Sequence, residues 1–173
     1  MNTVSLRKVE LTDIEILQDL AKKTFYETFE SFNTKEDMQN YLNENFSIDK
    51  LRSELENPLS EFYFAEFEHK MVGYLKINSS KAQTEIKNTN SLEIERIYIL
   101  QGYQKMKIGQ LLFEKALSIA KTENYEYIWL GVWEENPKAI AFYKKNGFIE
   151  FDKHIFRLGD DEQTDIMMKL NLK

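Results

Sequence analysis

The residues with the clearest chemical potential lie between Leu92 and Gln110, where an apolar segment leads through a short loop into an amphipathic helix. The first N–H groups of a helix have no partner inside it, and the helix dipole adds partial positive charge at the same end. A phosphate can therefore accept several of these donors at once. The loop and the first helical turn consist of Gln104, Lys105, Met106, Lys107, Ile108, Gly109 and Gln110. This stretch predicts the binding of a phosphorylated cofactor.

The common nucleotide-binding patterns do not describe this loop. The P-loop pattern G-x-x-x-x-G-K-[ST] is absent from the sequence, and so is a G-x-G-x-x-G run after the first expected strand. The loop is instead similar to the pyrophosphate loop of the GNAT family of N-acetyltransferases, [QR]-x-x-G-x-[GA]. Gln104 and Gly109 match that pattern, whereas Lys107 stands where the family usually has its first glycine. The backbone at residue 107 must therefore adopt a conformation that a side chain allows, and the lysine adds charge toward a phosphate.

The same resemblance extends over most of the chain from Leu92 to Lys169 and is closest to PaiA-like polyamine acetyltransferases, which act on spermidine or spermine. The residues before Leu92 match only in general layout. The loop alone is a weak signal, but the loop, the N-P-x-A-x-x-F-Y-x-x-x-G-F run and their spacing together are specific. The runs that carry the resemblance are LEIERIYIL, KIGQLLFEKA, WLGVWEENPKAIAFYKKNGF and HIFRLGDDEQTDIMMK.

The resemblance implies acetyl-CoA as the acetyl donor. Backbone groups of Ile97, Tyr98 and Ile99 would pair with its pantetheine arm as an added strand does, while their side chains pack in the core. The amides from Gln104 to Gln110 would hold its pyrophosphate. The strands over residues 92–100 and 127–133 would splay apart to admit the arm.

Three further residues are expected to face the cofactor. Asn136 is well placed to cap the helix that follows it, and the resemblance also places it beside the cofactor arm. Lys138 and Lys145 would put positive charge near a polyanionic ligand, although each could also be ordinary solvated charge. For the neighbouring Lys144, the solvated interpretation is favoured.

Tyr143 is the expected catalytic acid. Acetyl transfer to an amine expels the CoA thiolate, and a thiol pKa of ~8.5 lies close enough to a tyrosine pKa of ~10 for a phenol to supply the proton. The alternative is a core tyrosine with its hydroxyl group at the surface.

The acceptor amine must lose a proton before it attacks, because a primary amine with pKa ~10.4 is almost wholly protonated at neutral pH. Glu95 lies just before the arm-binding residues, where related enzymes often carry a carboxylate base, and is the expected base. Since an ordinary carboxylate is too weak a base for direct transfer, it would act through water or after desolvation. Glu93 shares its strand face and is the rival, and either residue could be a plain exposed carboxylate.

The substrate-binding residues are expected to be Tyr26, Phe29, Glu30 and Glu134, which would form an acidic, aromatic mouth for a cationic amine. Each carboxylate alone could equally be solvated charge, and the aromatic rings could simply pack the helix. Trp129 and Trp133 are expected to pack their strand. His69 and His154 are expected to be structural, since no spacing suggests a metal site.

The elements that would position these residues form a mixed α/β (α+β) GNAT fold: a mostly antiparallel sheet of about seven strands, with helices on both faces. The strand over 92–100 connects through a helix to the strand over 127–133, so these two should be parallel. The expected strands cover residues 4–9, 61–68, 70–78, 92–100, 127–133, 148–158 and 164–170. The first expected helix is capped by Thr12 or Asp13. The other expected helices cover residues 34–45, 48–56, 107–122 and 136–145.

Composition bounds the remaining possibilities. The 173 residues suit one N-acetyltransferase domain over 1–173, and a net charge of -6 argues against a nucleic-acid partner and suits a small cationic amine. Cysteine is absent, and no signal peptide or membrane span is recognisable, so the expected location is cytoplasmic. A homodimer is possible. Two alternatives stay open: a protein or peptide N-acetyltransferase, and a regulatory module that binds acyl-CoA without turnover.

Overall fold

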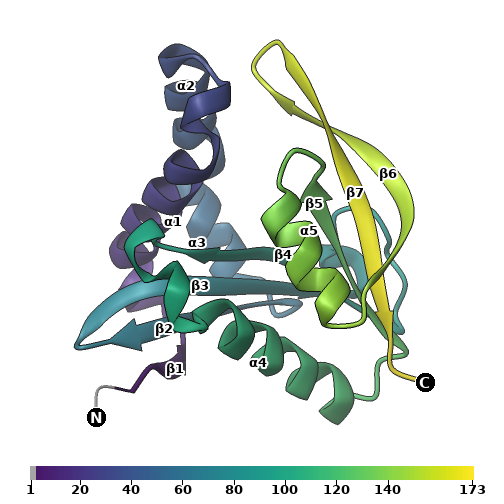
Figure 1. Ribbon diagram of the computed structural model, residues 1–173. Helices are drawn as coiled ribbons and strands as arrows, with labels where there is room; N and C mark the ends of the chain where they lie inside the picture. The colour runs from purple at the N-terminus through teal and green to yellow at the C-terminus, as the bar shows by residue number, and fades with distance from the viewer. Residues whose placement is uncertain (1–2) are drawn as a thin grey trace.

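The computed structural model describes residues 3–173, in which seven strands form one mixed sheet in the order β1-β2-β3-β4-β5-β7-β6 (Figure 1). The strands are β1 (Ser5–Lys8), β2 (Ser60–Phe67), β3 (Lys70–Ser79), β4 (Ser91–Ile99), β5 (Tyr127–Trp133), β6 (Ile149–Leu158) and β7 (Asp161–Asn171). The helices are α1 (Ile14–Phe29), α2 (Lys35–Asn45), α3 (Ile48–Glu56), α4 (Ile108–Thr122) and α5 (Pro137–Lys145). Short 3-10 turns are η1 (Leu11–Asp13), η2 (Glu30–Phe32), η3 (Ser80–Ala82) and η4 (Gln101–Met106).

All neighbouring strands are antiparallel except β4 and β5, which are parallel as the helical crossover predicted. These two strands pair only at their beginnings, where Ser91–Glu93 face Tyr127–Trp129. Beyond that point β4 stays on β3 and β5 stays on β7, so the sheet splits into two halves. This confirms the expected splay, and it leaves one edge of β4 and one edge of β5 without a strand partner.

The helices cover both faces of the sheet, as expected (Figure 1). On one face α4 and α5 bury an apolar core that includes Ile108, Leu112 and Tyr143. On the other face α1, α2 and α3 bury a second core rich in aromatic rings, including Phe25 and Phe29. The two cores pack against the sheet from opposite sides.

The ends of α5 follow the signals in its sequence. The Asn136 side chain accepts a hydrogen bond from the amide of Ala139 at 3.2 Å, and Pro137 occupies the first turn. Gly147 adopts a φ of 94°, which suits the left-handed residue that ends a helix. Both expectations for this helix are confirmed.

The start of α1 differs from expectation. The Asp13 side chain does not cap this helix; it instead binds Arg7 at 2.8 Å and accepts from the amide of Glu10 in a capping box around η1. The competing ion pair with β1 thus replaces the simple cap. At the other end of the chain, β7 begins at Asp161, three residues before the expected Thr164, because its hairpin with β6 is tighter than the sequence suggested.

A β-bulge interrupts β4 in the middle. Lys76 of β3 pairs with Arg96 and the next residue, Ile77, pairs with Ile94, so the ladder skips Glu95. A bulge places two consecutive side chains on one face of the strand. Glu95 and Arg96 therefore point to the same face, that of α1 to α3, together with Glu93.

Candidate active site

The start of α4 carries free backbone donors. The amide of Leu111 bonds to the carbonyl oxygen of Lys107 at 3.2 Å, so the amides of Ile108, Gly109 and Gln110 precede the first intrahelical bond. Lys107 is the residue before the helix and has φ 59° and ψ 20°, the left-handed region that glycine prefers. This left-handed residue makes the turn from the loop into the helix.

Lysine side chains lie on the loop before these amides and on α5, which is joined to it. Lys138 of α5 donates to the side-chain oxygen of Gln104 at 3.1 Å, which joins the start of α5 to η4. Gln110 donates to Asn146 at 3.0 Å, which joins α4 to the end of α5. Lys105, Met106 and Lys107 are exposed on the loop, and Lys145 is exposed on α5. Lys144 instead forms an ion pair with Glu150 at 2.9 Å, as its solvated interpretation predicted.

The backbone of β4 offers hydrogen-bonding groups to the splay. The amide of Leu100 bonds to Val72 of β3 at 2.9 Å, and successive residues of a strand point their N–H and C=O groups to opposite edges. Tyr98 therefore faces β3, which agrees with the 2.9 Å between its carbonyl oxygen and a Cβ built on Gly73. Ile97 and Ile99 present their backbone groups to the opposite edge, where no strand pairs with them. Of the three expected arm-binding residues, two are thus oriented toward the splay.

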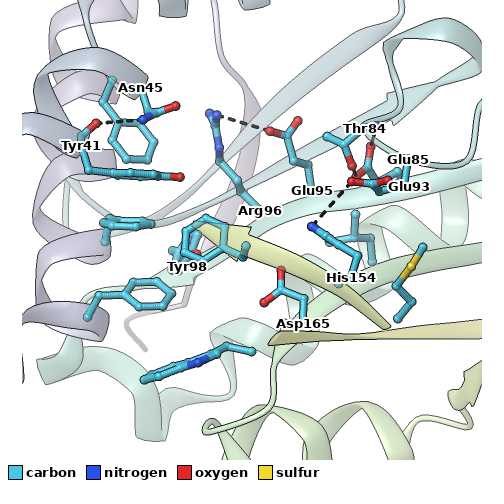
Figure 2. A pocket seen from close by; sticks show the side chains of 18 of the residues that line it. Tyr41, Asn45, Thr84, Glu85, Glu93, Glu95, Arg96, Tyr98, His154 and Asp165 are labelled. Carbon is cyan, nitrogen blue, oxygen red and sulfur yellow. Dashed lines mark hydrogen bonds and ion pairs between the residues drawn. The ribbon is translucent and has the colours of Figure 1, made fainter. Parts of the chain in front are cut away.

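A cavity of about 300 Å³ lies on the α1 to α3 face of the sheet, beside the splay (Figure 2). Glu93, Glu95 and Arg96 of β4 line one side of it, and Gly131 lines it from β5. Aromatic rings from α1, α2, β5 and β6 line the rest: Phe25, Phe29, Tyr41, Phe46, Trp133 and Phe156. The cavity is therefore apolar at one end and acidic at the other.

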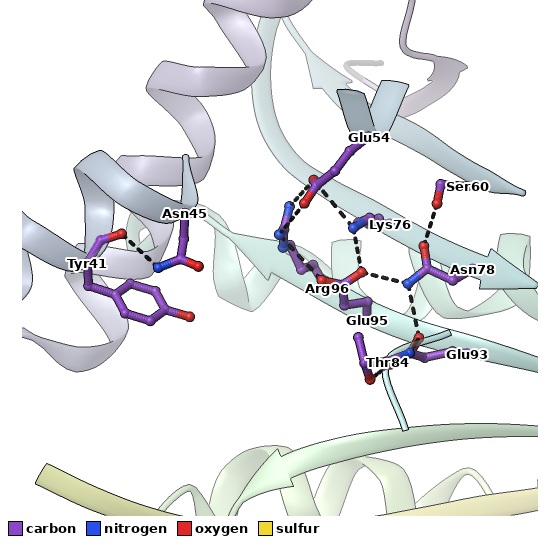
Figure 3. A network of polar contacts seen from close by, with 10 residues as sticks. All are labelled: Tyr41, Asn45, Glu54, Ser60, Lys76, Asn78, Thr84, Glu93, Glu95 and Arg96. Carbon is purple, nitrogen blue, oxygen red and sulfur yellow. Dashed lines mark hydrogen bonds and ion pairs between the residues drawn. The ribbon is translucent and has the colours of Figure 1, made fainter. Parts of the chain in front are cut away.

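Glu95 belongs to a buried ion cluster (Figure 3). Its carboxylate contacts Lys76 at 2.5 Å and Arg96 at 3.4 Å, and it accepts from Asn78 at 2.6 Å. Both cations also bind Glu54 of α3. Burial alone would raise the pKa of Glu95, but the charges of Arg96 and Lys76 outweigh it and lower that pKa to about 2. Such a carboxylate is a weak base, so these contacts argue against the expected role of Glu95.

Glu93 has the opposite environment. Its side chain is only 2% exposed and accepts hydrogen bonds from the amide and hydroxyl of Thr84 and from Asn78. Burial raises its pKa, and the nearby charge of Glu95 acts in the same direction, whereas the hydrogen bonds oppose the rise. Glu93 is therefore the more basic of the two β4 carboxylates.

Tyr143 lies on the opposite face of the sheet from the cavity. Its ring packs between Phe142 and Phe148, and burial raises its pKa above the ordinary value. Within residues 3–173 its hydroxyl group makes no hydrogen bond, yet that group is not fully enclosed. The phenol thus stays protonated throughout the neutral pH range. Because its pKa is raised, proton transfer from this phenol to a thiolate is less favourable than the ordinary tyrosine pKa suggested. Burial of the thiol in the same surroundings would raise the thiol pKa too and would bring the two values closer together.

The structure does not bring the expected substrate residues together. Phe29 is buried and lines the cavity. Tyr26 and Glu30 lie on the exposed side of the end of α1, and Glu134 is exposed just after β5, so none of these three lines the cavity. Helical periodicity explains the first pair, because residues one position from Phe25 and Phe29 point away from the face that those rings cover.

Sequence reasoning missed most of the charged residues of the cavity, which include Lys50, Glu54, Glu85, Arg96, His154 and Asp165. Arg96 enters because of the bulge. His154 and Asp165 face each other across the pair β6–β7, and His154 lies 3.6 Å from Glu85 of the preceding polar loop. His69, by contrast, lies fully exposed in the turn between β2 and β3, away from the cavity. No local signal marks His154 or Asp165, because only the long-range strand order brings them to the cavity.

Two features are absent from the described chain. In residues 3–173, no group of three or more His, Cys, Asp or Glu side chains is arranged to hold a metal ion. Nor does that part of the chain contain a helix long and apolar enough to cross a membrane.

Comparisons with known proteins bear on the family and the fold of the chain. A family model described as the acetyltransferase (GNAT) family matches residues 15–148. An uncharacterized N-acetyltransferase of Lactobacillus delbrueckii subsp. lactis is 38% identical over 169 residues, which cover 98% of each chain. The spermidine N(1)-acetyltransferase of Thermoplasma acidophilum is 26% identical, over 96% of each chain. The crystal structure of PaiA N-acetyltransferase from Thermoplasma acidophilum in complex with coenzyme A has a TM-score of 0.80 at 24% identity, covering 98% of this chain and 99% of that one.

Proposed function

The chain belongs to the acetyltransferase (GNAT) family, and from this premise we propose that it transfers the acetyl group of acetyl-CoA to a primary amine, with a polyamine such as spermidine as acceptor. The observation that carries the proposal is the splay between β4 and β5. It runs between free amides at the start of α4 and an acidic, aromatic cavity on the opposite face of the sheet.

The residues at the splay fit acetyl-CoA, the acetyl donor of this family. The free amides of Ile108, Gly109 and Gln110, with Lys105 and Lys138 nearby, suit a pyrophosphate. A Cβ added to Gly109 would meet only Ile99, at 3.5 Å, so no protein atom requires glycine there, and its absent side chain leaves room for a phosphate. The outward backbone groups of Ile97 and Ile99 suit an extended amide-bearing arm.

The acceptor cavity suits an amine on a carbon chain. Its carboxylates favour a cation. Its aromatic rings can pack against methylene groups, and their faces attract positive charge. The similarity to a spermidine N(1)-acetyltransferase over nearly the whole chain supports a polyamine as acceptor. We further propose that residues 1–173 act as one N-acetyltransferase domain.

The proposed chemistry is direct attack in a ternary complex. When bound, acetyl-CoA supplies a thioester carbon that accepts the amine nitrogen and a sulfur that leaves. Tyr143 donates its phenolic proton to that sulfur, and the second proton that the nitrogen loses after its attack restores the phenol. The amine loses its proton to Glu93, through water, because Glu93 has the higher proton affinity of the two carboxylates on β4. Glu95 holds Lys76 and Arg96 in place and so fixes the floor of the cavity.

A free-thiol assay with acetyl-CoA and a panel of polyamines, amino acids and peptides tests the proposal. Saturable thiol release with spermidine and none with peptides is the expected result. Release with peptides alone would replace the acceptor by a protein N-terminus or side chain. Binding of CoA with no release on any amine would leave a regulatory module that binds acyl-CoA without turnover.

The variant Tyr143→Phe tests the acid. It removes one hydroxyl group from an otherwise unchanged ring, so we expect kcat to fall roughly 10- to 100-fold, within the usual contribution of a positioned acid, while CoA affinity measured by calorimetry stays within twofold. Phe142→Leu, a change in the neighbouring ring, is the matched control for packing. Unchanged turnover in Tyr143→Phe would remove this residue from its role.

A further inference from the structure

Carboxylates of the acceptor cavity differ in what they already bind. Those that line it are Glu54, Glu85, Glu93, Glu95 and Asp165. Glu54 and Glu95 bind Lys76 and Arg96, and Glu93 binds Thr84 and Asn78. Glu85 lies within ion-pair distance of His154.

Asp165 is the exception among these carboxylates. Within the described residues its carboxylate has no hydrogen bond and no ion pair, although it lines the cavity from β7. His154 is its register partner on β6, but the imidazole of His154 is directed to Glu85, 3.6 Å away. The lone pairs of Asp165 are thus available to a ligand, whereas those of Glu54, Glu93 and Glu95 are largely engaged, and Glu85 is half exposed and lies beside His154.

The position of Asp165 is close to the splay. Asp165 pairs with Trp133 of the neighbouring strand β5. Its Oδ2 atom lies 3.4 Å from the point that a Cβ atom on Gly131 would occupy. Gly131 follows Trp129, the last residue of β5 that pairs with β4, so it borders the opening itself. In the view of Figure 2 the carboxyl group of Asp165 lies between the side chains of Tyr98 and His154 and points into the cavity.

The surroundings of Asp165 favour a cationic neighbour. Burial raises the pKa of Asp165, which means that its charge is poorly solvated and gains from a positive partner, and His154 offsets this only in part. Trp133, the β5 neighbour of Asp165, has its ring centroid 5.2 Å from that of Phe29, which lies 6.0 Å from Phe156, so these three rings form an apolar wall of the same cavity. A carboxylate followed by aromatic rings matches an ammonium group followed by methylene groups.

We propose that Asp165 is the carboxylate that binds the primary amine of the acceptor and holds it at the splay. This inference rests on the proposed function and names the residue that selects its substrate. The amine would then bind to a residue of β7, which lies across the splay from the β4 carboxylates. Glu93 and Glu95 then contribute a proton acceptor and a rigid floor, respectively, rather than the first contact with the amine.

Asp165→Asn tests this proposal, because the substitution keeps the shape of the side chain and removes its charge. We expect KM for spermidine to rise at least tenfold, while KM for acetyl-CoA stays within twofold. Glu162→Gln is the matched control: it removes a carboxylate from the same strand at an exposed position that is paired with Arg157 outside the cavity. It should leave both KM values within twofold of the wild type.

Calorimetry separates this inference from the proposed function. Spermidine is titrated into the CoA-bound protein, and the expected result is binding to the wild type and to Glu162→Gln that is at least tenfold weaker in Asp165→Asn. This result supports the role of Asp165 even if no turnover is found, in which case only the proposed function fails. Equal spermidine affinity in Asp165→Asn and the wild type, or no binding of spermidine to the wild type, would overturn the inference.

Discussion

Glu93 and Glu95 are two positions apart on β4 and share a face, yet their surroundings change their pKa values in opposite directions. Burial raises the pKa of Glu93, whose neighbours are neutral donors. Burial acts on Glu95 in the same sense, but Arg96 and Lys76 reverse it. The bulge decides the difference, because it turns Arg96 onto the same face as Glu95. The resemblance suggested Glu95 as the base and the period of the strand added Glu93 as its rival, but neither signal could show that Glu95 is the less basic of the two.

The ion cluster predicts a pH-dependent contribution of Glu95 to stability. Because its folded pKa of about 2 lies below the unfolded value, its contribution is complete above the unfolded pKa and is lost as pH falls toward 2. Glu95→Gln should lower the free energy of unfolding at pH 7 on the order of 2–3 kcal/mol, and the difference from wild type should shrink below about pH 4. Urea denaturation at pH 7 and pH 3.5 measures both quantities. A difference that is constant with pH would contradict this assignment.

Lys107 combines two effects that a pair of variants can separate. Its φ of 59° is strained for a side chain, and its charge lies beside the free amides of α4. Lys107→Gly and Lys107→Ala both remove the charge, but only glycine relieves the backbone. The glycine variant should therefore be about 1 kcal/mol more stable than the alanine variant, while both lose the same fraction of CoA affinity. Equal stability of the two variants in thermal unfolding would show that the left-handed backbone at residue 107 costs nothing.

At the scale of elements, α5 carries both a residue that contacts the loop before α4 and the expected catalytic acid. Its first turn carries Lys138, which reaches η4, and its last turn carries Tyr143 on the face opposite the cavity. The cap at Asn136 fixes where this helix begins. The position of the helix thus determines how the expected acid is placed relative to the free amides of α4.

Asn136 was expected both to cap α5 and to face the cofactor arm, and substitutions can test the two roles separately. Asn136→Ala should lower the free energy of unfolding by about 1 kcal/mol through loss of the cap. Asn136→Asp keeps a capping oxygen and should retain the stability of the wild type, but its charge should weaken the binding of the anionic cofactor severalfold if the side chain faces the arm. Chemical denaturation and CoA calorimetry on the two variants decide the matter. Unchanged CoA affinity in Asn136→Asp would leave Asn136 as a cap alone.

Elements whose signals are local could be predicted from the sequence, and those that depend on long-range pairing could not. Periodicity gave α3 and β5 with their observed bounds, and the Asn-Pro and Gly signals gave α5. The bulge at Glu95 had no such signal, since no glycine or proline marks it. Asp165 and His154 entered the cavity only because β7 lies between β5 and β6, an order that no short stretch of sequence encodes.

At the scale of the whole molecule, the proposed reaction needs two ligands of opposite charge. The chain has a net charge of -6, which favours a cationic amine and repels the polyanionic cofactor. Lys105 and Lys107 add positive charge to the loop before α4, and the acidic cavity lies on the opposite face of the sheet. The splay thus lies between the lysines of this loop on one side and the acidic cavity on the other.

This separation of charge predicts different responses of the two substrates to salt. The Debye length falls from about 30 Å at 0.01 M to about 8 Å at 0.15 M salt, so added salt screens the long-range attraction between the acidic protein and the amine. For acetyl-CoA, the same salt screens a nearby attraction by lysines and a distant repulsion by the net charge, and these partly cancel. KM for spermidine should therefore rise several-fold between 0.01 and 0.3 M NaCl, whereas KM for acetyl-CoA should change by less than twofold. Replacement of Lys105 and Lys138 by alanine together removes the local attraction, so in that variant KM for acetyl-CoA should be higher and should fall as salt is added. A spermidine KM that does not depend on salt would mean that the net charge of the protein has no part in selecting the amine.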